Sequence, residues 1–144
     1  EESRWFSPGR TQVVTEAAGA RIGVMICYDL RFPEMCRSLC LDGATIVIVS
    51  AQWPASRISH WDVLLSARAI ENQVFLVAVN RCGLENGVTF NGHSRIISPE
   101  GHLLADAGEY CGEAMAAIDT TAVNIFRSRF STITERVPDA YNHL

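Results

Sequence analysis

Residues 23–34 read GVMICYDLRFPE, and this stretch decides the fold. An almost wholly apolar run ends in Cys27 and gives way at once to polar and charged side chains. Continuous apolar residues indicate a strand that is covered on both faces, and Pro33 suits the first turn of a helix. The pattern therefore predicts that Cys27 lies at a sharp turn between a buried strand and a helix.

Two interpretations of Cys27 follow from the residues alone. A cysteine at the end of a buried strand is most often inert and packed in the core. A strand-to-helix turn, however, exposes a nucleophile at the edge of the sheet, and the backbone N–H groups after the turn can hold an oxyanion. The start of the following helix also favours the thiolate. The residues alone leave both interpretations standing.

Apolar runs of the same kind occur at two further places in the chain. Residues 21–27, 44–50 and 74–80 are nearly continuous apolar runs, which are typical of buried strands. Residues 32–43 and 59–73, which lie between them, carry apolar side chains at helical spacing. Strands that alternate with helices predict an α/β fold with helices packed over a buried sheet.

The second half of the chain predicts smaller elements. Residues 92–106 read as two strands around a Ser-Pro-Glu-Gly turn. Residues 113–119 (EAMAAID) suggest another strand, and a short helix is expected after Thr120. Residues 127–144 show no clear period and are expected to form an extended arm. No internal linker divides the chain, so residues 1–144 are expected to belong to one domain.

Composition excludes several classes of function. The 144 residues carry a net charge of −4, which argues against a nucleic-acid-binding surface, and no apolar run is long enough to span a membrane. Five cysteines form an odd set without a CxxC pair, and the four histidines add no metal-ligand pattern. We therefore expect neither a metal nor another cofactor. Scattered free thiols also fit a reducing compartment, so a cytoplasmic location is expected.

The stretch at residues 23–34 resembles the nucleophile segment of the nitrilase, or carbon–nitrogen hydrolase, superfamily. Three further segments resemble the same family in the same order: residues 2–9 (ESRWFSPG), 60–73 (HWDVLLSARAIENQ) and 92–101 (GHSRIISPEG). Residues 52–61 (QWPASRISHW), taken together with the nucleophile segment, look most like the omega-amidase branch. The resemblance implies an α-β-β-α sandwich of the nitrilase type.

The resemblance also implies roles for individual residues. Cys27 corresponds to the nucleophile, and the backbone N–H of Tyr28 to an oxyanion donor. Glu2 stands where an assisting glutamate is found in the family, although an acidic residue near a chain end is ordinarily just solvated. Arg31 resembles the arginine that holds the far carboxylate of the substrate in omega-amidase-like members.

Arg31 has a second interpretation that needs no substrate. It stands close in sequence to Asp29 and Glu34, and an ion pair with either one is a common structural use of an arginine at a helix start. A guanidinium that faces a carboxylate substrate is the functional alternative. The two roles are not exclusive.

The chain departs from the family in one respect. The general-base glutamate and the lysine of the family lie upstream of the matched segments, and this chain, which begins with Glu1, contains no lysine because all twelve basic residues are arginine. The resemblance therefore implies that residues 1–144 are the C-terminal half of a carbon–nitrogen hydrolase domain, truncated at its N-terminus.

The expected activity is hydrolysis of an amide bond in a small carboxylate-bearing substrate, through a thioester on the cysteine. Hydrolysis of nitriles or of N-carbamoyl amino acids is an alternative, as is a papain-like mechanism in which a histidine such as His60 or His93 serves as base. A third alternative is an inactive fragment or pseudoenzyme, because the lysine and the general base are absent. The resemblance further implies that the complete protein forms a homodimer.

Overall fold

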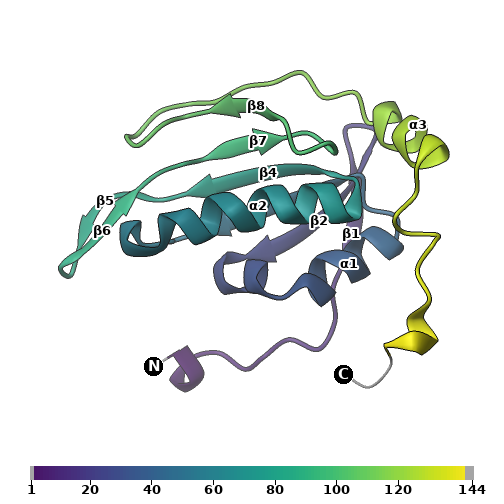
Figure 1. The fold of residues 1–144 in the computed structure, drawn as a ribbon. Helices are drawn as coiled ribbons and strands as arrows, with labels where there is room; N and C mark the ends of the chain where they lie inside the picture. The colour runs from purple at the N-terminus through teal and green to yellow at the C-terminus, as the bar shows by residue number, and fades with distance from the viewer. Residues whose placement is uncertain (1, 142–144) are drawn as a thin grey trace.

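The computed structural model describes residues 2–141, and its centre is a six-stranded sheet in the order β1-β2-β3-β4-β7-β8 (Figure 1). The strands β2, β3 and β4 run parallel to one another, while β1, β7 and β8 pair antiparallel with their neighbours. The six strands are β1 (Val14–Ala17), β2 (Ala20–Ile26), β3 (Ile46–Ala51), β4 (Phe75–Asn80), β7 (Arg95–Ile97) and β8 (Leu103–Asp106).

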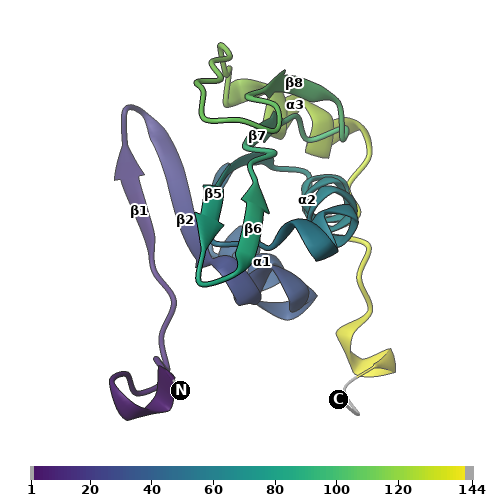
Figure 2. The ribbon, with the colours of Figure 1, turned by 90° about the vertical axis from the view of Figure 1, so that its left-hand side faces the viewer.

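Two helices cover one face of this sheet, α1 (Pro33–Leu41) and α2 (Ile58–Asn72), and Figure 2 shows them on the same side. The hairpin of β5 (Cys82–Glu85) and β6 (Val88–Asn91) extends beyond the sheet. The remaining helical segments are α3 (Thr121–Arg129) and the short 3-10 turns η1 (Glu2–Arg4), η2 (Cys27–Arg31), η3 (Ala55–Arg57) and η4 (Pro138–Ala140). No helix among residues 2–141 is long and apolar enough to cross a bilayer.

The core lies between the sheet and these two helices. Met25, Val47 and Leu76 point from the three parallel strands towards Trp61 and Leu65 of α2, and all five are fully buried. Apolar side chains on one stripe of each helix thus meet alternate side chains of the strands. This shared burial stabilises the strands and helices that these runs of sequence form.

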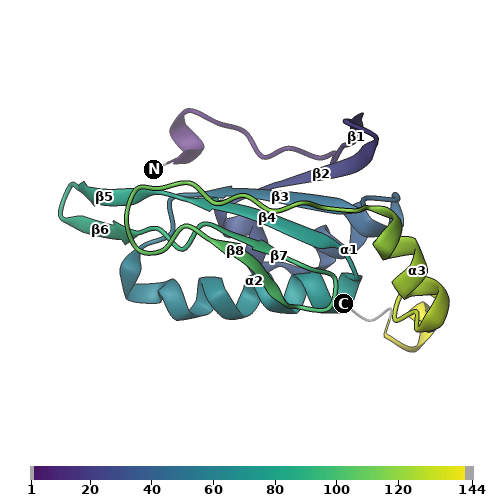
Figure 3. The ribbon, with the colours of Figure 1, turned by 90° about the horizontal axis from the view of Figure 1, so that it is seen from above.

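The other face of the sheet is apolar but open. Ile26 has 66% of its surface exposed and Val79 has 54%, although both belong to the central parallel strands. Figure 3 shows the strands from above, with α2 along one side of the sheet. The described residues thus form one helix layer and one sheet layer, which is half of the expected four-layer sandwich.

The structure confirms most of the predicted elements. The three apolar runs form β2, β3 and β4, the segments between them form α1 and α2, the turn after residue 97 joins β7 to β8, and a helix follows Thr120. The strands β1, β5 and β6 were not predicted.

The predicted strand at residues 113–119 is wrong. Exposure alternates along this segment as it would in a strand, but the segment belongs to neither sheet of the described structure. A period of two fixes which side chains turn inward, whereas a strand also needs a neighbour for its backbone N–H and C=O groups. Without a neighbour the segment is irregular.

Helix α3 continues to Arg129, so residues 127–129 of the segment that was expected to form an extended arm are helical. Residues 130–137 are irregular and the short turn η4 follows. The side chain of Gln73 binds the start of this segment, with its amide N–H donating to the carbonyl of Phe130 and its Oε1 accepting from the N–H of Thr132 at 3.3 Å. The C-terminal segment therefore packs against the end of α2.

Candidate active site

The carboxyl ends of β2, β3 and β4 meet at one edge of the sheet. Ile26 pairs with Ser50, and Ala51 pairs with Asn80, so the three strands end side by side. An open hollow of about 740 Å³ lies at this edge, and Cys27 is among its lining residues. Ligands of parallel α/β sheets bind at this edge because loops leave the strands there.

Cys27 is the first residue after β2 and begins the 3-10 turn η2. Its φ is +46°, a left-handed conformation that is strained for a residue with a side chain. The carboxylate of Asp29 accepts a hydrogen bond from the N–H of Ile26 at 2.9 Å and closes the turn. The half-buried thiol lies 4.0 Å from the carbonyl oxygen of Gln52. A strained cysteine at the end of a strand has the geometry of a nucleophile elbow.

Tyr28 follows the cysteine in the first turn of η2. The first N–H groups of a helical turn have no partner within that turn, so this backbone N–H can face an oxyanion formed at Cys27. The ring of Tyr28 is mostly exposed and meets Phe32 edge-on, with 5.5 Å between the ring centroids.

Arg31 lies at the end of η2 and is stacked on an aromatic ring. Its guanidinium carbon is 4.5 Å from the ring centroid of Trp53 and 5.6 Å from that of Tyr28. Within residues 2–141 no carboxylate forms an ion pair with this guanidinium, so the alternative of an ion pair with Asp29 or Glu34 is not what the structure shows. Arg31 lines a second hollow of about 190 Å³ together with Cys27.

Arg68, a buried arginine of α2, holds the backbone of η2. Arg68 of α2 donates hydrogen bonds from Nη2 to the carbonyl oxygens of Leu30 at 3.0 Å and Arg31 at 3.3 Å. Its Nη1 forms an ion pair with Glu71 at 2.9 Å. Arg68 therefore fixes the backbone of η2, which carries both Cys27 and Arg31.

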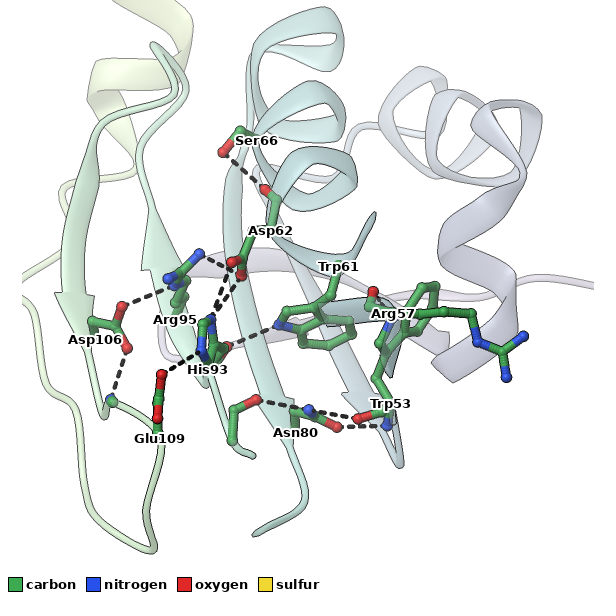
Figure 4. A network of polar contacts seen from close by, with 12 residues as sticks. Trp53, Arg57, Trp61, Asp62, Ser66, Asn80, His93, Arg95, Asp106 and Glu109 are labelled. Carbon is green, nitrogen blue, oxygen red and sulfur yellow. Dashed lines mark hydrogen bonds and ion pairs between the residues drawn. The ribbon is translucent and has the colours of Figure 1, made fainter. Parts of the chain in front are cut away.

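The loop between β3 and α2 forms a wall of the site that was not predicted from the sequence. Gln52 and Trp53 of this loop line the small hollow beside Cys27. Asn80, at the end of β4, holds Trp53: Oδ1 accepts from the Trp53 N–H at 2.6 Å, and Nδ2 donates to the Trp53 carbonyl at 3.1 Å (Figure 4). The only sequence signal for this contact is an Asn at the end of an apolar run. That signal does not identify a hydrogen-bond partner 27 residues away.

His93 belongs to a separate network of polar contacts. Its Nδ1 lies 3.1 Å from the carboxylate of Asp62, which also pairs with Arg95 at 2.5 Å, and Arg95 in turn contacts Asp106 at 2.9 Å (Figure 4). Neither hollow lined by Cys27 includes a histidine. The geometry therefore gives no support to a histidine base.

Glu2 begins the short turn η1, and its side chain lies outside what the structure describes.

Among residues 2–141, no group of three or more potential metal ligands lies together. Burial and the neighbouring Cys111 thiol raise the pKa of the Cys82 thiol.

Comparison with known proteins identifies the family. The family model for carbon–nitrogen hydrolases matches residues 1–126. The chain belongs to the carbon–nitrogen hydrolase family. Solved structures of the family superpose closely: the NitFhit protein of C. elegans matches 97% of this chain and 35% of its own with a TM-score of 0.90 and 31% identity. The nitrilase-like fold is thereby confirmed.

The relatives of this carbon–nitrogen hydrolase chain include omega-amidases, as the resemblance predicted. A 2-oxoglutaramate amidase from Bacillus subtilis is 43% identical over 83% of this chain and 46% of its own length. Omega-amidase YafV from Escherichia coli is 37% identical over 90% of this chain and 51% of its own length. The chain therefore spans about half the length of these relatives.

A solved structure illustrates the chemistry in a relative. A mutant of the amidase from Nesterenkonia sp. AN1 shows covalent addition of the acetamide moiety of fluoroacetamide at its active-site cysteine. It matches 99% of this chain and 52% of its own with a TM-score of 0.86 and 30% identity.

Proposed function

We propose that this chain is the nucleophile-bearing, C-terminal half of an omega-amidase-like enzyme that hydrolyses the amide of a small carboxylate-bearing substrate. The observation that carries the proposal is Cys27, held in a left-handed turn at the carboxyl end of three parallel strands and open to a hollow. The omega-amidases among the relatives and the cysteine adduct of the related amidase support the same chemistry.

In the proposed reaction, the Cys27 thiolate attacks the amide carbonyl carbon, and the Tyr28 N–H stabilises the oxyanion. The general-base glutamate, which is expected upstream together with the lysine, takes the thiol proton of Cys27 and passes it to the amide nitrogen, so that the C–N bond breaks and ammonia leaves. Water attacks the resulting thioester, which releases the carboxylic acid and restores the thiol. Glu2 assists in this step, and Arg31 binds the carboxylate at the far end of the substrate.

The location, the additional layer and the oligomeric state of the complete protein are also part of the proposed function. Free, unpaired thiols on the described chain support a reducing, cytoplasmic location. The open apolar face of the sheet supports an additional layer contributed by the upstream half. The complete enzyme is proposed to form a homodimer, as the family resemblance implies.

The direct test is ammonia release by the complete enzyme with Cys27→Ala. We expect the rate to fall by roughly 10⁴-fold or more, because no other group can form the acyl intermediate. Cys111→Ala removes an exposed cysteine outside the site and serves as the matched control. Full activity of the Cys27 variant would refute the assignment. The same enzyme, assayed on a nitrile and on an N-carbamoyl amino acid, separates the amidase from the alternatives named above.

A second candidate is that residues 1–144 alone are catalytically incomplete. The chain contains no lysine, so it cannot supply the cation that the family uses at the oxyanion. Loss of a single such group commonly lowers the rate about 10²–10³-fold. The intact mass of the natural protein decides between the two: a mass near 15.9 kDa favours the incomplete chain, and about twice that mass favours the complete amidase.

A further inference from the structure

Two arginines line the small hollow beside the nucleophile. This hollow, of about 190 Å³, has Cys27, Trp53, Arg31 and Arg57 among its lining residues. No carboxylate lines it. Asp29 is the acidic residue closest to Arg31 in the sequence, and its carboxylate accepts a hydrogen bond from the N–H of Ile26. Two arginines and no carboxylate are therefore among the residues that line the hollow.

Trp53 positions both arginines. One face of its ring lies against the guanidinium of Arg31, at 4.5 Å from the ring centroid, and its indole N–H donates to the backbone carbonyl of Arg57 at 2.8 Å. Asn80 in turn holds the backbone of Trp53. Figure 4 shows the side chain of Arg57 extending away from this network. The backbone of Arg57 is thus anchored, while Arg57 is an exposed residue whose side chain has no polar partner among residues 2–141.

Two like charges on one small hollow repel each other, and a bound anion relieves that repulsion. Guanidinium groups match the geometry of a carboxylate because each can donate two parallel hydrogen bonds. Cys27 also lines this hollow. A substrate whose carboxylate binds to the arginines can therefore place its other end at the Cys27 thiol.

We propose that Arg57 is a specificity residue, which binds together with Arg31 the carboxylate at the far end of the substrate. This inference rests on the proposed amidase function and deepens it, because it selects monoamides of dicarboxylic acids over neutral amides of the same length. Arg57 acts on binding and takes no part in the chemistry at Cys27.

The first test uses the chain itself and needs no catalysis. Iodoacetate and iodoacetamide both alkylate a thiolate with loss of iodide, but only iodoacetate is an anion. We expect Arg57→Gln to slow modification of Cys27 by iodoacetate about tenfold, since a cationic wall raises the local concentration of anions, and to leave the rate with iodoacetamide unchanged. The exposed Cys111 in the same sample is the internal reference, read by peptide mass spectrometry.

The second test uses the complete enzyme. For the monoamide of a four-carbon dicarboxylic acid, Arg57→Gln is expected to raise KM roughly 10- to 100-fold with little change in kcat, the loss expected for a hydrogen bond to a charged group. The kcat/KM for butanamide, which lacks the carboxylate, is expected to stay the same. Arg129→Gln, an exposed arginine of α3, is the matched control.

The two tests separate the two proposals. If the complete enzyme hydrolyses no amide, the amidase function fails, while the iodoacetate ratio still supports or overturns the anion site. If Arg57→Gln leaves the iodoacetate rate unchanged, the anion site is refuted whatever the activity. An equal loss for the charged and the neutral amide also overturns the inference, because Arg57 would then act through the shape of the loop.

Discussion

The side-chain amide of Asn80 holds the backbone of Trp53 from both sides. Its Oδ1 accepts from the Trp53 N–H at 2.6 Å, and its Nδ2 donates to the Trp53 carbonyl at 3.1 Å. The same Nδ2 donates to the carbonyl of Gly92 at 2.7 Å. Asn80 is buried, so the amide replaces water for all three groups. One side chain at the end of β4 therefore fixes the loop that lines the site.

We predict that Asn80→Ala lowers the free energy of unfolding by about 2–3 kcal/mol, because buried backbone groups lose their partners. The activity of the complete enzyme should also fall, by roughly 10- to 100-fold in kcat/KM, since Trp53 is displaced. Urea unfolding and steady-state kinetics measure the two effects. Asn124→Ala, on the exposed surface of α3, is the control and should change neither.

A second variant at the same position isolates the donor. Asn80→Asp keeps the oxygen that accepts from Trp53 but turns a second oxygen towards two carbonyl groups. We expect it to be at least as unstable as the alanine variant. Wild-type stability in Asn80→Asp would contradict the role given to Nδ2.

Arg68, which forms an ion pair with Glu71, supports the turn η2 that begins at Cys27. Arg68→Met keeps the apolar volume but removes the donors to the carbonyls of Leu30 and Arg31. We predict a loss of about 2 kcal/mol in the free energy of unfolding, because the carbonyl groups of Leu30 and Arg31 lose their donor, while the partly exposed Glu71 can turn to water. Urea unfolding measures it, with Arg129→Met as the exposed control. A loss as small as that of the control would show that η2 holds its shape without Arg68.

Much of the fold could be predicted because it depends on local patterns. The apolar runs that form β2, β3 and β4 are continuous, which is typical of strands in a parallel sheet, although among the described residues helices cover only one face of them. The turn at Cys27 was predictable for the same reason, since Cys27 ends an apolar run and Pro33, six residues later, begins a helix. These signals lie within about a dozen residues of each other.

The rest of the site depends on residues that are distant in sequence. Arg57 and Arg31 line one hollow only because β3 lies beside β2 in the sheet. Asn80 reaches Trp53 only because β4 lies beside β3. A periodic pattern shows that a strand is buried, but it does not show which strand lies beside it. The failed strand at residues 113–119 has the same cause, because its pattern was right and its neighbour was missing.

Helix α1 packs closely against β2 at Gly23. A Cβ atom on this residue would lie 3.1 Å from three side-chain atoms of Leu39 in α1. We predict that Gly23→Ala lowers the free energy of unfolding by about 1–3 kcal/mol through overpacking. Gly9→Ala is the matched control, since a Cβ there meets nothing within 4 Å.

The double variant Gly23→Ala, Leu39→Ala tests the cause of that loss. Truncating Leu39 alone leaves a cavity, but the new methyl group at position 23 then has room. The two changes should therefore destabilise less together than the sum of their separate effects, as determined from urea unfolding. Strict additivity would mean that the loss comes from the backbone of β2 and not from contact with α1.

The pH dependence of stability is predicted to include a contribution from Asp106. Partial burial raises the pKa of this carboxyl, but the hydrogen bonds from the Gly108 N–H and from Arg95, with the positive charge of Arg95, outweigh it and hold the pKa below its usual 3.8. A carboxyl whose pKa is lower in the folded protein stabilises the fold above the pKa of the unfolded chain. That contribution is lost as the pH falls through the folded pKa.

We therefore expect Asp106→Asn to be less stable than wild type from about pH 7 down to about pH 5, by an amount that does not change with pH in that window. Below about pH 4 the difference should shrink, because the wild-type carboxylate becomes protonated and loses its advantage over the amide. Urea unfolding at closely spaced pH values measures this difference directly. Glu113→Gln, which removes an exposed carboxylate beyond β8, provides the control. A difference that widened on acidification would mean that the ion pair with Arg95 destabilises the fold.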